Sequence, residues 1–593
     1  MVFIHKLGLI LAASLISLSF TADAAACKYN NGLACPEQTP CCSPVRISSL
    51  LSTVTQFNSI TTQSSLHDNL TTDEKPKPIP TQPKGSFKVV GLTGVAAQHI
   101  ALVTPKKMLI IDKAENNPAK LPSGKAAHTV EYDIETNEYR VLDVATNTFC
   151  SGGGFLPNGT LISGGGAEAR QTHTFDATKG FQSLRMWQPC EDNSCEWIEN
   201  PADPAWEMTG NRWYVSFTTL PSGDLFILGG SNESLAINRY ATNNPTWEFY
   251  PKSADFQPVH MPFMVDAMPN NLYPNVYSLP DGNLYIFANQ KSCIYSVERR
   301  EEIKRLPDLP GGPRSYPLTG SHVLLPLDPA KNYAHEILVC GGSEAMTTHS
   351  NALSSCGRIN LHADDPQWEM DEMPTPRLMS DAVILADGKV MLLNGAQIGY
   401  AGFLRASNPI YTPVVYDPDA PHGQRFTEWT PSNIARMYHS VATLLPDGTV
   451  FVAGSNQNSE VRFENVPFPT EYRVESFTPP YLTTDLERPE IVSEIPEKLT
   501  YDQKLDIVID VKATDKYEPD VTFMLGHRGF VTHSTHMSQR VTKLVSTKTT
   551  EDGTKITYSV AMPPNANLMP PGPHYIHMLN NGVPSKAIHF ILN

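Results

Sequence analysis

A tyrosine and a histidine, Tyr438 and His439, are adjacent in the sequence just before a tight turn that joins two apolar runs. This Leu-Pro-x-Gly turn recurs along the chain, flanked by runs typical of paired antiparallel strands. Counting six residues back from the leading leucine of four copies gives Cys150, Tyr214, Tyr273 and His439. Equivalent positions of a repeated unit converge in a closed array, so we predict that these side chains face one another. The four turns are residues 156–159, 220–223, 279–282 and 445–448.

These residue types could hold a copper ion. Two imidazoles, His439 and His533, and two phenols, Tyr214 and Tyr438, make a set of two nitrogen and two oxygen donors, with the Cys150 thiol beside them. Cu(II) favours such tetragonal coordination and stands at the top of the divalent affinity series. Zinc sites more often show a third histidine, a carboxylate or several thiolates. A lone Tyr or His in a β-repeat is usually a core residue, so the shared register carries this prediction.

The elements that would position these residues form a repeat from about residue 89 to residue 477. Pairs of apolar, strand-like runs end in a Gly-rich stop and recur roughly every 50–60 residues, as kelch-type propeller blades of four strands do. Seven copies would close a ring, so we predict a seven-bladed β-propeller; a series of β-sandwiches is the alternative. The pairs cover residues 155–166, 220–230, 279–289, 322–342, 382–396 and 444–455, with a weaker first copy at 100–112.

The pattern changes after residue 482. Short alternating runs separated by turns follow, such as residues 505–511 and 555–560, and they are typical of an immunoglobulin-like sandwich. His533 lies in this part, so it can join the other candidates only if a hairpin extends down the propeller axis. The predicted fold is therefore all-β. A kelch-type propeller over residues 87–486 carries the metal site, and an immunoglobulin-like domain over residues 487–593 supplies one histidine.

The N-terminal region predicts a secreted protein. Residues 1–26 combine a lysine, an apolar run and a small-residue cleavage site, as a signal peptide does. The alternative, a membrane anchor, is disfavoured because the run is short for a full span. Residues 27–42 are a small Cys-rich segment, and residues 43–86 are a linker rich in Ser, Thr and Pro. We therefore predict an extracellular protein that does not cross a membrane.

Composition and charge narrow the class of protein. A chain of 593 residues is too long for one core, and its 40% hydrophobic and 18% charged content is typical of globular domains. The net charge of −16 argues against nucleic acid, because binding phosphates needs clustered Lys and Arg.

An extracellular location permits disulfides. The predicted pairs are Cys190 with Cys195 and Cys340 with Cys356; Cys150 and Cys293 are left over, and the pairing of Cys27, Cys35, Cys41 and Cys42 stays open.

Several stretches together resemble the copper radical oxidases, most closely glyoxal oxidases and more distantly galactose oxidase. The resemblance spans roughly residues 90–593. Its specificity comes from the combination of motifs rather than from any single one. The matching stretches are residues 148–154 (Thr-Phe-Cys-Ser-Gly-Gly-Gly), 212–214 (Arg-Trp-Tyr), 436–440 (Arg-Met-Tyr-His-Ser), 477–482 (Phe-Thr-Pro-Pro-Tyr-Leu), 532–534 (Thr-His-Ser), 537–540 (Met-Ser-Gln-Arg) and 581–585 (Asn-Gly-Val-Pro-Ser).

The resemblance implies a role for each candidate residue. Cys150 and Tyr214 would be joined by a thioether bond between sulfur and phenol ring, and Tyr214 would ligate copper and carry a radical. His439 and His533 would be equatorial ligands, and Tyr438 the axial ligand and general base. Such a centre suits a two-electron oxidation, because copper accepts one electron and a sulfur-substituted phenol supplies the second. A metal-bound phenol also ionises below its usual pKa of about 10.

The resemblance therefore implies a secreted copper radical oxidase that converts small aldehydes, such as glyoxal and methylglyoxal, to carboxylic acids while reducing O2 to H2O2. The substrate would be the hydrated aldehyde, a geminal diol with an alcohol-like C–H bond. We expect a monomer whose partners are this substrate and O2, with peroxidases as users of the peroxide, and with no nucleic acid or membrane bound. The alternatives are a primary-alcohol or galactose-type oxidase with the same centre, and a non-catalytic kelch protein that binds carbohydrate.

One departure from galactose oxidase concerns the surroundings of the radical. That enzyme stacks a Trp over the thioether in the segment after a Gly-Gly-Ser, and here the same triplet at 229–231 is followed by Asn232. The departure favours the glyoxal oxidase branch and puts the shielding of the radical in question. Tyr273 and Met379, at equivalent positions of the repeat, are expected to line the pocket, with a structural role as the alternative. Glycosylation sequons begin at Asn69, Asn158 and Asn232, and we expect the last to stay unused because a glycan there would crowd the site.

Overall fold

The computed structural model describes residues 78–593 except 201–202, 204–205, 235–236, 254 and 513–516. In this part of the chain the regular structure is strand, apart from α1 (Pro262–Asp266) and the short 3-10 helices η2 (Pro329–Lys331) and η3 (Pro480–Leu482). The all-β prediction is confirmed. None of the described helices has the length and apolar character needed to span a bilayer. The predicted signal peptide, the Cys-rich segment and most of the linker lie outside the described residues.

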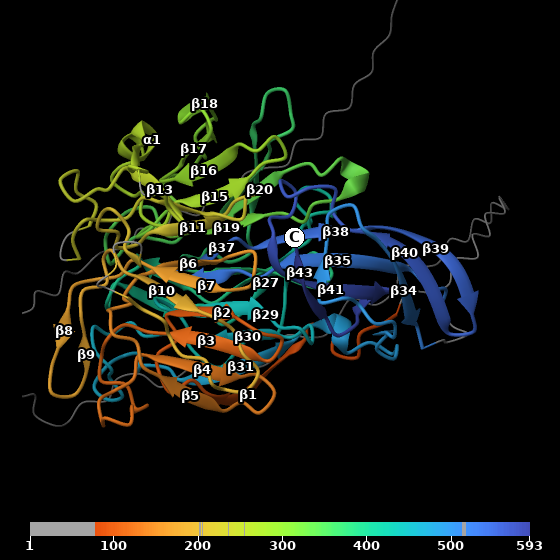
Figure 1. The fold of residues 1–593 in the computed structure, drawn as a ribbon, viewed down its shortest axis with the longest axis horizontal. Helices are drawn as coiled ribbons and strands as arrows, with labels where there is room; N and C mark the ends of the chain where they lie inside the picture. Colours follow the sequence, from red (N-terminus) through yellow and green to blue (C-terminus); the bar gives the residue numbers. More distant parts are fainter. Residues whose placement is uncertain (1–77, 201–202, 204–205, 235–236, 254, 513–516) are drawn as a thin grey trace, which may run out of the picture. The chain divides into compact units, whose positions relative to one another are not determined.

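Seven antiparallel sheets follow one another along the chain between residues 86 and 478 (Figure 1). The first four are built from β2 (His99–Leu102), β3 (Lys107–Ile111), β4 (Thr129–Asp133) and β5 (Tyr139–Leu142); from β6 (Gly152–Phe155), β7 (Leu161–Gly164) and β10 (Leu184–Trp187); from β11 (Ser216–Thr219), β12 (Leu225–Leu228), β13 (Thr246–Tyr250) and β14 (Val259–His260); and from β15 (Asn275–Ser278), β16 (Leu284–Ala288), β17 (Lys291–Ser296) and β18 (Glu301–Arg305).

The remaining three sheets continue the same order, and the last one takes its outer strand from the beginning of the described chain. They consist of β19 (Ser321–Leu324), β20 (Glu336–Cys340), β21 (Ser355–Asn360) and β22 (Trp368–Glu372); of β23 (Asp381–Ile384), β24 (Val390–Leu393), β27 (Val414–Tyr416) and β28 (Phe426–Glu428); and of β29 (Val441–Leu444), β30 (Val450–Ala453), β31 (Arg473–Thr478) and β1 (Ser86–Leu92). Two small hairpins, β8 (Arg170–Gln171) with β9 (Asp176–Ala177) and β25 (Ala396–Gly399) with β26 (Ala406–Pro409), extend from the connections.

Burial decreases across each sheet from its first strand to its last. Every residue of the leading strands β2, β6, β11, β15, β19, β23 and β29 is buried, whereas outer strands such as β18 and β28 are largely exposed. Strands buried on both faces are near-continuous apolar runs, which explains the apolar pairs in the sequence. Leading strands of successive sheets contact one another, as β6 and β11, β11 and β15, and β23 and β29 do.

The tight turns between the first and second strands are confirmed. In the turn between β6 and β7, the Gly159 N–H donates to the Leu156 carbonyl at 2.9 Å and Gly159 has φ +86°. In the turn between β29 and β30, the Gly448 N–H donates to the Leu445 carbonyl at 2.9 Å with φ +83°. The left-handed conformation explains why glycine closes each turn. Gly388 closes a fifth turn of this kind after β23, without the proline.

Both disulfides predicted from spacing are present, and they join Cys190 to Cys195 and Cys340 to Cys356. The two cysteines left over, Cys150 and Cys293, are buried free thiols. One of them lies in the candidate site. The other packs in a separate apolar cluster that includes residues of β12, β16 and β17.

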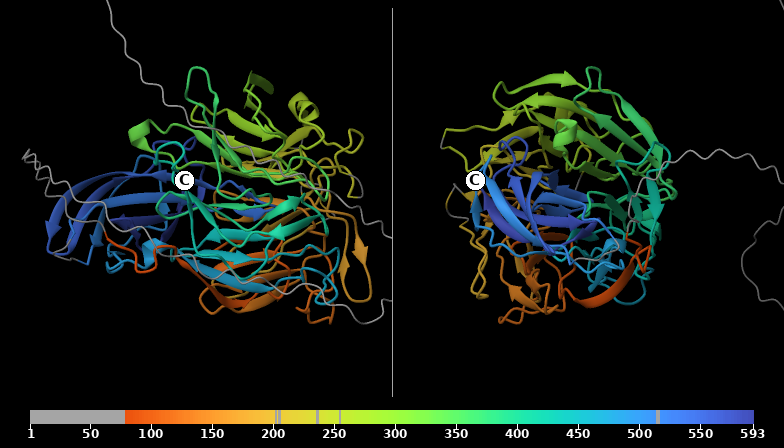
Figure 2. Two further views of the ribbon diagram at one scale, coloured as in Figure 1. Left: turned by 180° about the vertical axis from the view of Figure 1, so that it is seen from behind. Right: turned by 90° about the vertical axis from the view of Figure 1, so that its right-hand side faces the viewer.

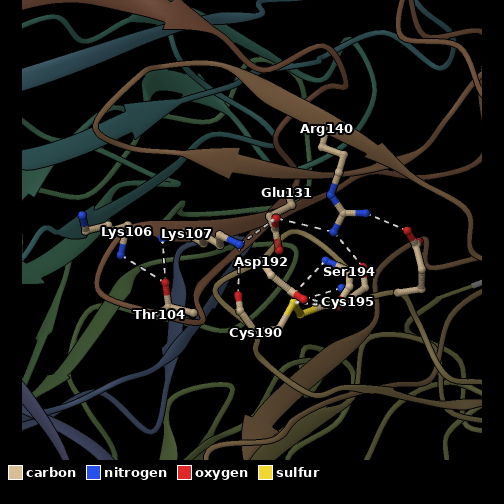
Figure 3. A network of polar contacts seen from close by, with 10 residues as sticks. Thr104, Lys106, Lys107, Glu131, Arg140, Cys190, Asp192, Ser194 and Cys195 are labelled. Atoms are coloured by element: carbon tan, nitrogen blue, oxygen red, sulfur yellow. Dashed lines mark hydrogen bonds and ion pairs between the residues drawn. A yellow bond between two sulfur atoms is a disulfide. The ribbon is translucent and has the colours of Figure 1, made fainter.

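Two cations that pair with a buried carboxylate hold the first disulfide loop against the first sheet (Figure 3). Glu131 of β4 pairs with Lys107 and Arg140 of the neighbouring strands, each at 3.5 Å. Lys107 Nζ also donates to the Cys190 carbonyl at 3.0 Å, and Arg140 Nη2 donates to the Cys195 carbonyl at 2.7 Å. Cations that are already paired with Glu131 thus position the disulfide loop through its backbone.

The C-terminal part packs two sheets around its own core. Ile507, Phe523, Val560, Ile576 and Phe590 are among its buried residues. The alternating burial of β34 is typical of strands with one face in a core. One sheet contains β32 (Glu490–Ile491), β34 (Lys504–Asp510), β40 (Lys555–Ala561) and β39 (Val545–Asp552); the other contains β33 (Lys498–Leu499), β43 (Ile588–Leu592), β41 (Gly572–Asn580), β35 (Val521–His527) and β38 (Arg540–Lys543), with β42 (Val583–Pro584) beside β41.

A hairpin between β35 and β38 leaves this sheet and packs against the leading strands of the other sheets. Its first strand, β36 (Phe530–Thr532), pairs with β2, and its second, β37 (Thr535–Met537), contacts β6, β11, β15, β19 and β23 (Figures 1 and 2). Gly153 of β6 permits this approach, since a Cβ there would lie 2.6 Å from the Phe530 ring. His533 sits at the tip of the hairpin, between β36 and β37.

Candidate metal centre

Five of the residues singled out in the sequence hold the same place in their local structure. Cys150, Tyr214, Tyr273, Met379 and His439 all lie two residues before the leading strand of a sheet. All five have positive φ, between 48° and 64°. This conformation is uncommon for residues other than glycine and costs free energy, so it persists only where the surrounding structure imposes it. The register counted from the turns thus corresponds to one repeated backbone geometry.

The backbone links these positions from one sheet to the next. The Tyr214 N–H donates to the Cys150 carbonyl at 3.0 Å, and the Tyr273 N–H donates to the Tyr214 carbonyl at 3.1 Å. Farther along, the Met379 N–H donates to the carbonyl of Thr319, the corresponding residue before β19, at 2.9 Å. These bonds satisfy backbone groups that burial would otherwise leave unpaired. They also fix the distances between the side chains.

The two histidines and the cysteine meet in one buried cluster. Nitrogen atoms of His439 and His533 and the sulfur of Cys150 lie within 4.8 Å of one another. The His533 Nε2 atom is 3.5 Å from Cys150 Sγ, and the two imidazole rings cross at 84° with centroids 4.8 Å apart. The other ring nitrogen of His533 lies 2.6 Å from the Thr532 hydroxyl, which orients the ring. The hairpin predicted to deliver His533 therefore brings it to His439.

Two of the predicted phenols complete the cluster. The hydroxyl oxygens of Tyr214 and Tyr438 are 3.4 Å apart. The Tyr438 ring stacks on the His439 ring with centroids 3.7 Å apart, and the Tyr214 ring meets His533 edge-on at 5.6 Å. All five predicted site residues are thus brought together, although they come from three sheets and the inserted hairpin.

The sequence analysis missed two polar residues of this cluster. The Tyr316 hydroxyl lies 2.7 Å from the Tyr214 hydroxyl and 2.8 Å from that of Tyr438. The Gln98 side-chain nitrogen lies 3.3 Å from Cys150 Sγ and 3.3 Å from a ring nitrogen of His439. Its carbonyl oxygen has no hydrogen-bond partner among the described residues. Both side chains therefore belong to the site.

A recurring arginine could have revealed Tyr316. Arg-x-Tyr occurs at 212–214, 314–316 and 436–438, and Arg-x-Met at 377–379. Each of these arginines is buried and donates to backbone carbonyls of its own sheet and loops, as Arg212 does to the Gly229 carbonyl at 2.8 Å. Two also pair with buried carboxylates, Arg212 with Glu248 and Arg436 with Glu475. A planar guanidinium thus anchors each loop that carries a site residue.

A family model described as "Glyoxal oxidase N-terminus" matches residues 103–481. The chain belongs to the glyoxal oxidase family. A second model, "Galactose oxidase-like, Early set domain", matches residues 488–590 of this family member. The "Aldehyde oxidase GLOX1" of Arabidopsis thaliana is 38% identical over 476 residues, covering 77% of this chain and 74% of its own. The "Aldehyde oxidase GLOX" of Vitis pseudoreticulata is 36% identical over 527 residues, covering 84% and 95%. The predictions of the family and of an oxidase are confirmed.

A solved structure shares the fold of this family member. It is described as a fungal alcohol oxidase of the AA5 family in complex with copper. It aligns with a TM-score of 0.64 at 20% identity, over 86% of this chain and 100% of that one. At this identity the likeness supports the fold alone.

Burial sets the protonation of the donors in this glyoxal oxidase family member. Desolvation lowers the pKa of His533 to about 3, and desolvation followed by the nearby His533 lowers the pKa of His439 well below its usual value. Both imidazoles are therefore neutral at pH 7 and keep a lone pair for a metal. Desolvation also raises the pKa of Tyr214 and Tyr438, so these phenols keep their protons unless a cation replaces them.

This donor set fits a copper ion. Neutral imidazole nitrogens and phenol oxygens match the tetragonal N,O preference of Cu(II). A buried divalent cation would offset the cost of ionising the phenols, because it lowers the pKa of groups that bind it. The nitrogens of His439 and His533 and the oxygens of Tyr214 and Tyr438 would hold the ion. The Cys150 sulfur, beside His533, would remain next to the Tyr214 ring.

The space beside the cluster is small. A cavity of about 10 Å³ adjoins Tyr438 and His439, which is room for about one water molecule. Phe403, on the connection between β25 and β26, packs edge-on against the cluster with its ring 5.7 Å from those of Tyr438 and His439. The cavity is lined by Thr319, Met379, Ala401, Met437, Tyr438, His439, Ser440, His533 and Ser534.

The two residues expected to line the pocket differ in position. Met379 lines the cavity, as expected. Tyr273 does not: its hydroxyl donates to the Ser151 carbonyl at 2.9 Å, and its ring packs against His533. Asn232 turns away to its own loop, where its side-chain nitrogen donates to the Asn243 carbonyl at 3.3 Å. The ring that stacks on Tyr214 is instead that of Tyr316.

Proposed function

We propose that this protein is a secreted copper radical oxidase. It oxidises small aldehydes, of the size of glyoxal or methylglyoxal, to carboxylic acids and reduces O2 to H2O2. Its cofactors are one copper ion and a thioether-linked Cys150–Tyr214 pair that carries a tyrosyl radical. The observation that carries the proposal is the convergence of Cys150, Tyr214, Tyr438, His439 and His533 in one buried cluster.

Two tyrosines of the cluster, Tyr438 and Tyr214, act in different steps of the proposed reaction. The Tyr438 oxygen takes a proton from a hydroxyl group of the hydrated aldehyde, and the oxidised Tyr214 oxygen takes the hydrogen atom from its carbon. Both oxygens can act on one substrate, because they lie 3.4 Å apart. Bound copper would accept the second electron. Cys150 sulfur on the Tyr214 ring makes that ring easier to oxidise.

The overall reaction balances without a further cofactor. The hydrated aldehyde loses two electrons and two protons and becomes the carboxylic acid, while O2 gains both and becomes hydrogen peroxide. Formation of the thioether is itself a two-electron oxidation, since it removes the Cys150 S–H hydrogen and one Tyr214 ring hydrogen; O2 would take up these two electrons and two protons and become hydrogen peroxide, with bound copper assisting. The partners are the aldehyde and O2, and peroxidases are the proposed users of the peroxide.

The enclosed site favours a small substrate. The cavity beside Tyr438 and His439 has a volume of about 10 Å³, which is too small for a sugar ring unless neighbouring side chains move. The two curated relatives described above are both named aldehyde oxidases, which also favours an aldehyde. A primary-alcohol oxidase with the same centre is the alternative that the substrate panel below tests.

The proposal extends to the fold and the location. The seven sheets are proposed as blades of a closed kelch-type propeller over residues 87–486, closed by the pairing of β1 with β31. Residues 487–593 are proposed as an immunoglobulin-like sandwich. Residues 1–26 are proposed as a signal peptide, and the protein is proposed to be an extracellular monomer. The two disulfides support the extracellular location.

A peroxidase-coupled assay tests the proposal. Copper-loaded, oxidant-activated protein is given glyoxal, methylglyoxal, galactose, glycerol and benzyl alcohol in parallel. We expect peroxide mainly from the two aldehydes. Cys150→Ser should abolish it while copper stays bound, since the nitrogen and oxygen donors remain.

The matched control is Cys293→Ser, which changes the other buried free thiol in a separate apolar cluster. It should keep full activity. Peroxide mainly from the alcohols would move the enzyme to the alcohol branch. No peroxide from any of the five substrates with copper bound, or an equal loss of activity in Cys150→Ser and Cys293→Ser, would contradict the proposed centre.

A further inference from the structure

A third phenol lies between the two that the proposed reaction uses. Tyr316 comes from the loop before β19, and its hydroxyl is within 2.8 Å of the oxygens of both Tyr214 and Tyr438. Its ring also stacks on the Tyr214 ring, with centroids 4.3 Å apart and planes at 28°. Tyr316 thus makes both a ring contact and a hydrogen-bond contact with Tyr214.

Tyr316 is held in place independently of the other site residues. It forms a backbone bridge with Leu272, in the connection before β15. Two residues before it, Arg314 is fully buried and donates to the Pro310 carbonyl at 3.0 Å and to the Ser355 hydroxyl at 2.9 Å. The next residue, Pro317, accepts a hydrogen bond from the Ala401 N–H at 2.9 Å. Anchoring on both sides fixes where the ring and its hydroxyl lie.

The Tyr214 ring is enclosed by other rings. Tyr316 stacks on it, the Trp213 ring lies at 4.3 Å and 45°, and Tyr273 meets it edge-on at 5.3 Å. A one-electron-oxidised phenol decays when reductants or water reach it, so contact with closely packed rings prolongs its life. The Tyr316 hydroxyl adds a donor at the one atom where the negative charge of the reduced phenolate concentrates.

We propose that Tyr316 is a positioning residue for the Tyr214 radical. Its ring shields the oxidised phenol, and its hydroxyl sets the phenol's potential by hydrogen-bonding the Tyr214 oxygen. The inference rests on the proposed function, because it assigns a task at the same centre. A hydroxyl carries one proton, so Tyr316 can donate to one neighbour while accepting from the other, which joins Tyr214 and Tyr438 in a single hydrogen-bonded chain.

Two variants separate the ring from the hydroxyl. Tyr316→Phe keeps the stacked ring and removes the donor, whereas Tyr316→Leu removes both. The matched control is Tyr333→Phe, a tyrosine in the connection between β19 and β20 at the far end of the same strand. Each protein is loaded with copper and oxidised. The thioether is then scored by peptide mass, copper by its content per chain, and the radical by absorption, lifetime and midpoint potential.

We expect all four proteins, including the wild type, to bind copper and form the thioether. Loss of a donor to a charged acceptor should lower the midpoint potential in Tyr316→Phe by about 60 mV, which is a tenfold change in the oxidised-to-reduced ratio for one electron. Its radical lifetime should stay near that of the wild type. Tyr316→Leu should shorten the lifetime about tenfold, because an aromatic contact is lost as well. Tyr333→Phe should change neither quantity.

The outcomes distinguish the two proposals. Normal thioether and copper with unchanged potential and lifetime in both Tyr316 variants would overturn the role of Tyr316 and leave the proposed function standing. A wild-type protein without thioether or copper would overturn both. Equal shortening of the radical lifetime in Tyr316→Phe and Tyr316→Leu would overturn the shielding by the ring.

Discussion

Replacing Glu248 by glutamine should loosen the loop that carries Tyr214. The Arg212 Nε atom donates to Glu248 Oε1 at 2.8 Å, and both side chains are fully buried. The other donors of Arg212 go to neutral groups, the Gly229 carbonyl and the carbonyl and hydroxyl of Thr246. Glutamine keeps the shape of Glu248 and removes its charge. The guanidinium would then remain buried without the counter-charge it has in the wild type.

The expected cost follows from this burial. Removing one partner of a buried ion pair destabilises a protein by about 3–5 kcal/mol, because an uncompensated charge stays in a medium that solvates it poorly. The shift in melting temperature per kcal/mol becomes smaller as a protein becomes longer. For a protein of this length we expect Tm to fall by roughly 5 °C. Arg212 positions Tyr214 two residues away, so copper affinity should also fall by about 10–100-fold, as for other residues that orient ligands.

The assay is thermal unfolding of the metal-free protein at a fixed scan rate, followed by copper titration. The control is Glu301→Gln, which removes a carboxylate from an exposed pair with Arg299, where each side chain is 57% exposed. Exposed pairs contribute about 0–1 kcal/mol, so this variant should melt within about 1 °C of the wild type. Equal melting temperatures for the two variants would refute the reasoning from burial, and unchanged copper affinity in Glu248→Gln would refute the anchoring of Tyr214.

Two further predictions concern the pH dependence of stability and the approach of the C-terminal hairpin. Burial lowers the pKa of His574 and His577 to about 4, below the unfolded value of about 6.5, so their contribution is complete above pH 6.5 and is lost as the pH falls toward 4. At pH 5 each of these two histidines lowers the free energy of unfolding by about 2 kcal/mol, so the metal-free protein should melt several degrees lower than at pH 7. A melting temperature that does not change with pH would contradict the lowered pKa values. Gly153→Ala would place a Cβ 2.6 Å from the Phe530 ring, so it should displace the hairpin and weaken copper binding. Gly210→Ala, where a Cβ would meet a single side-chain nitrogen at 3.2 Å, is the control, and equal copper affinity in both variants would exclude the clash.

The register of the site could be predicted because local chemistry sets it. A Leu-Pro-x-Gly turn needs a left-handed glycine at its end, and the strand before it is short, so a fixed count leads from Leu156 to Cys150 and from Leu445 to His439. The positive φ shared by these residues follows from the same repeated geometry. The pairing of β1 with β31 and of β36 with β2 depends on contacts between distant segments, which periodicity cannot report.

Counting six residues back from each turn does not find Tyr316 or Gln98, and the reasons are physical. The connection after β19 reads Leu-Pro-Leu-Asp at 325–328, without the glycine, and the loop before β19 is longer, so Tyr316 lies outside the register position held by Thr319. Gln98 reaches the cluster because β2 pairs with β36 of the hairpin. Its sequence neighbours carry no turn of the kind counted. The buried arginine two residues before each tyrosine was the signal that the count overlooked.

The insertion of β36 beside β2 also governs the order in which the centre can mature. Gln98 and His533 are in contact although 435 positions separate them in the chain. During synthesis the first six sheets can form while the second imidazole has not yet been made. Copper loading must therefore follow translation and the return of the C-terminal hairpin. A chain that terminates before residue 533 would lack one of the proposed copper ligands however well its sheets fold, and the proposed thioether at Cys150 would not form.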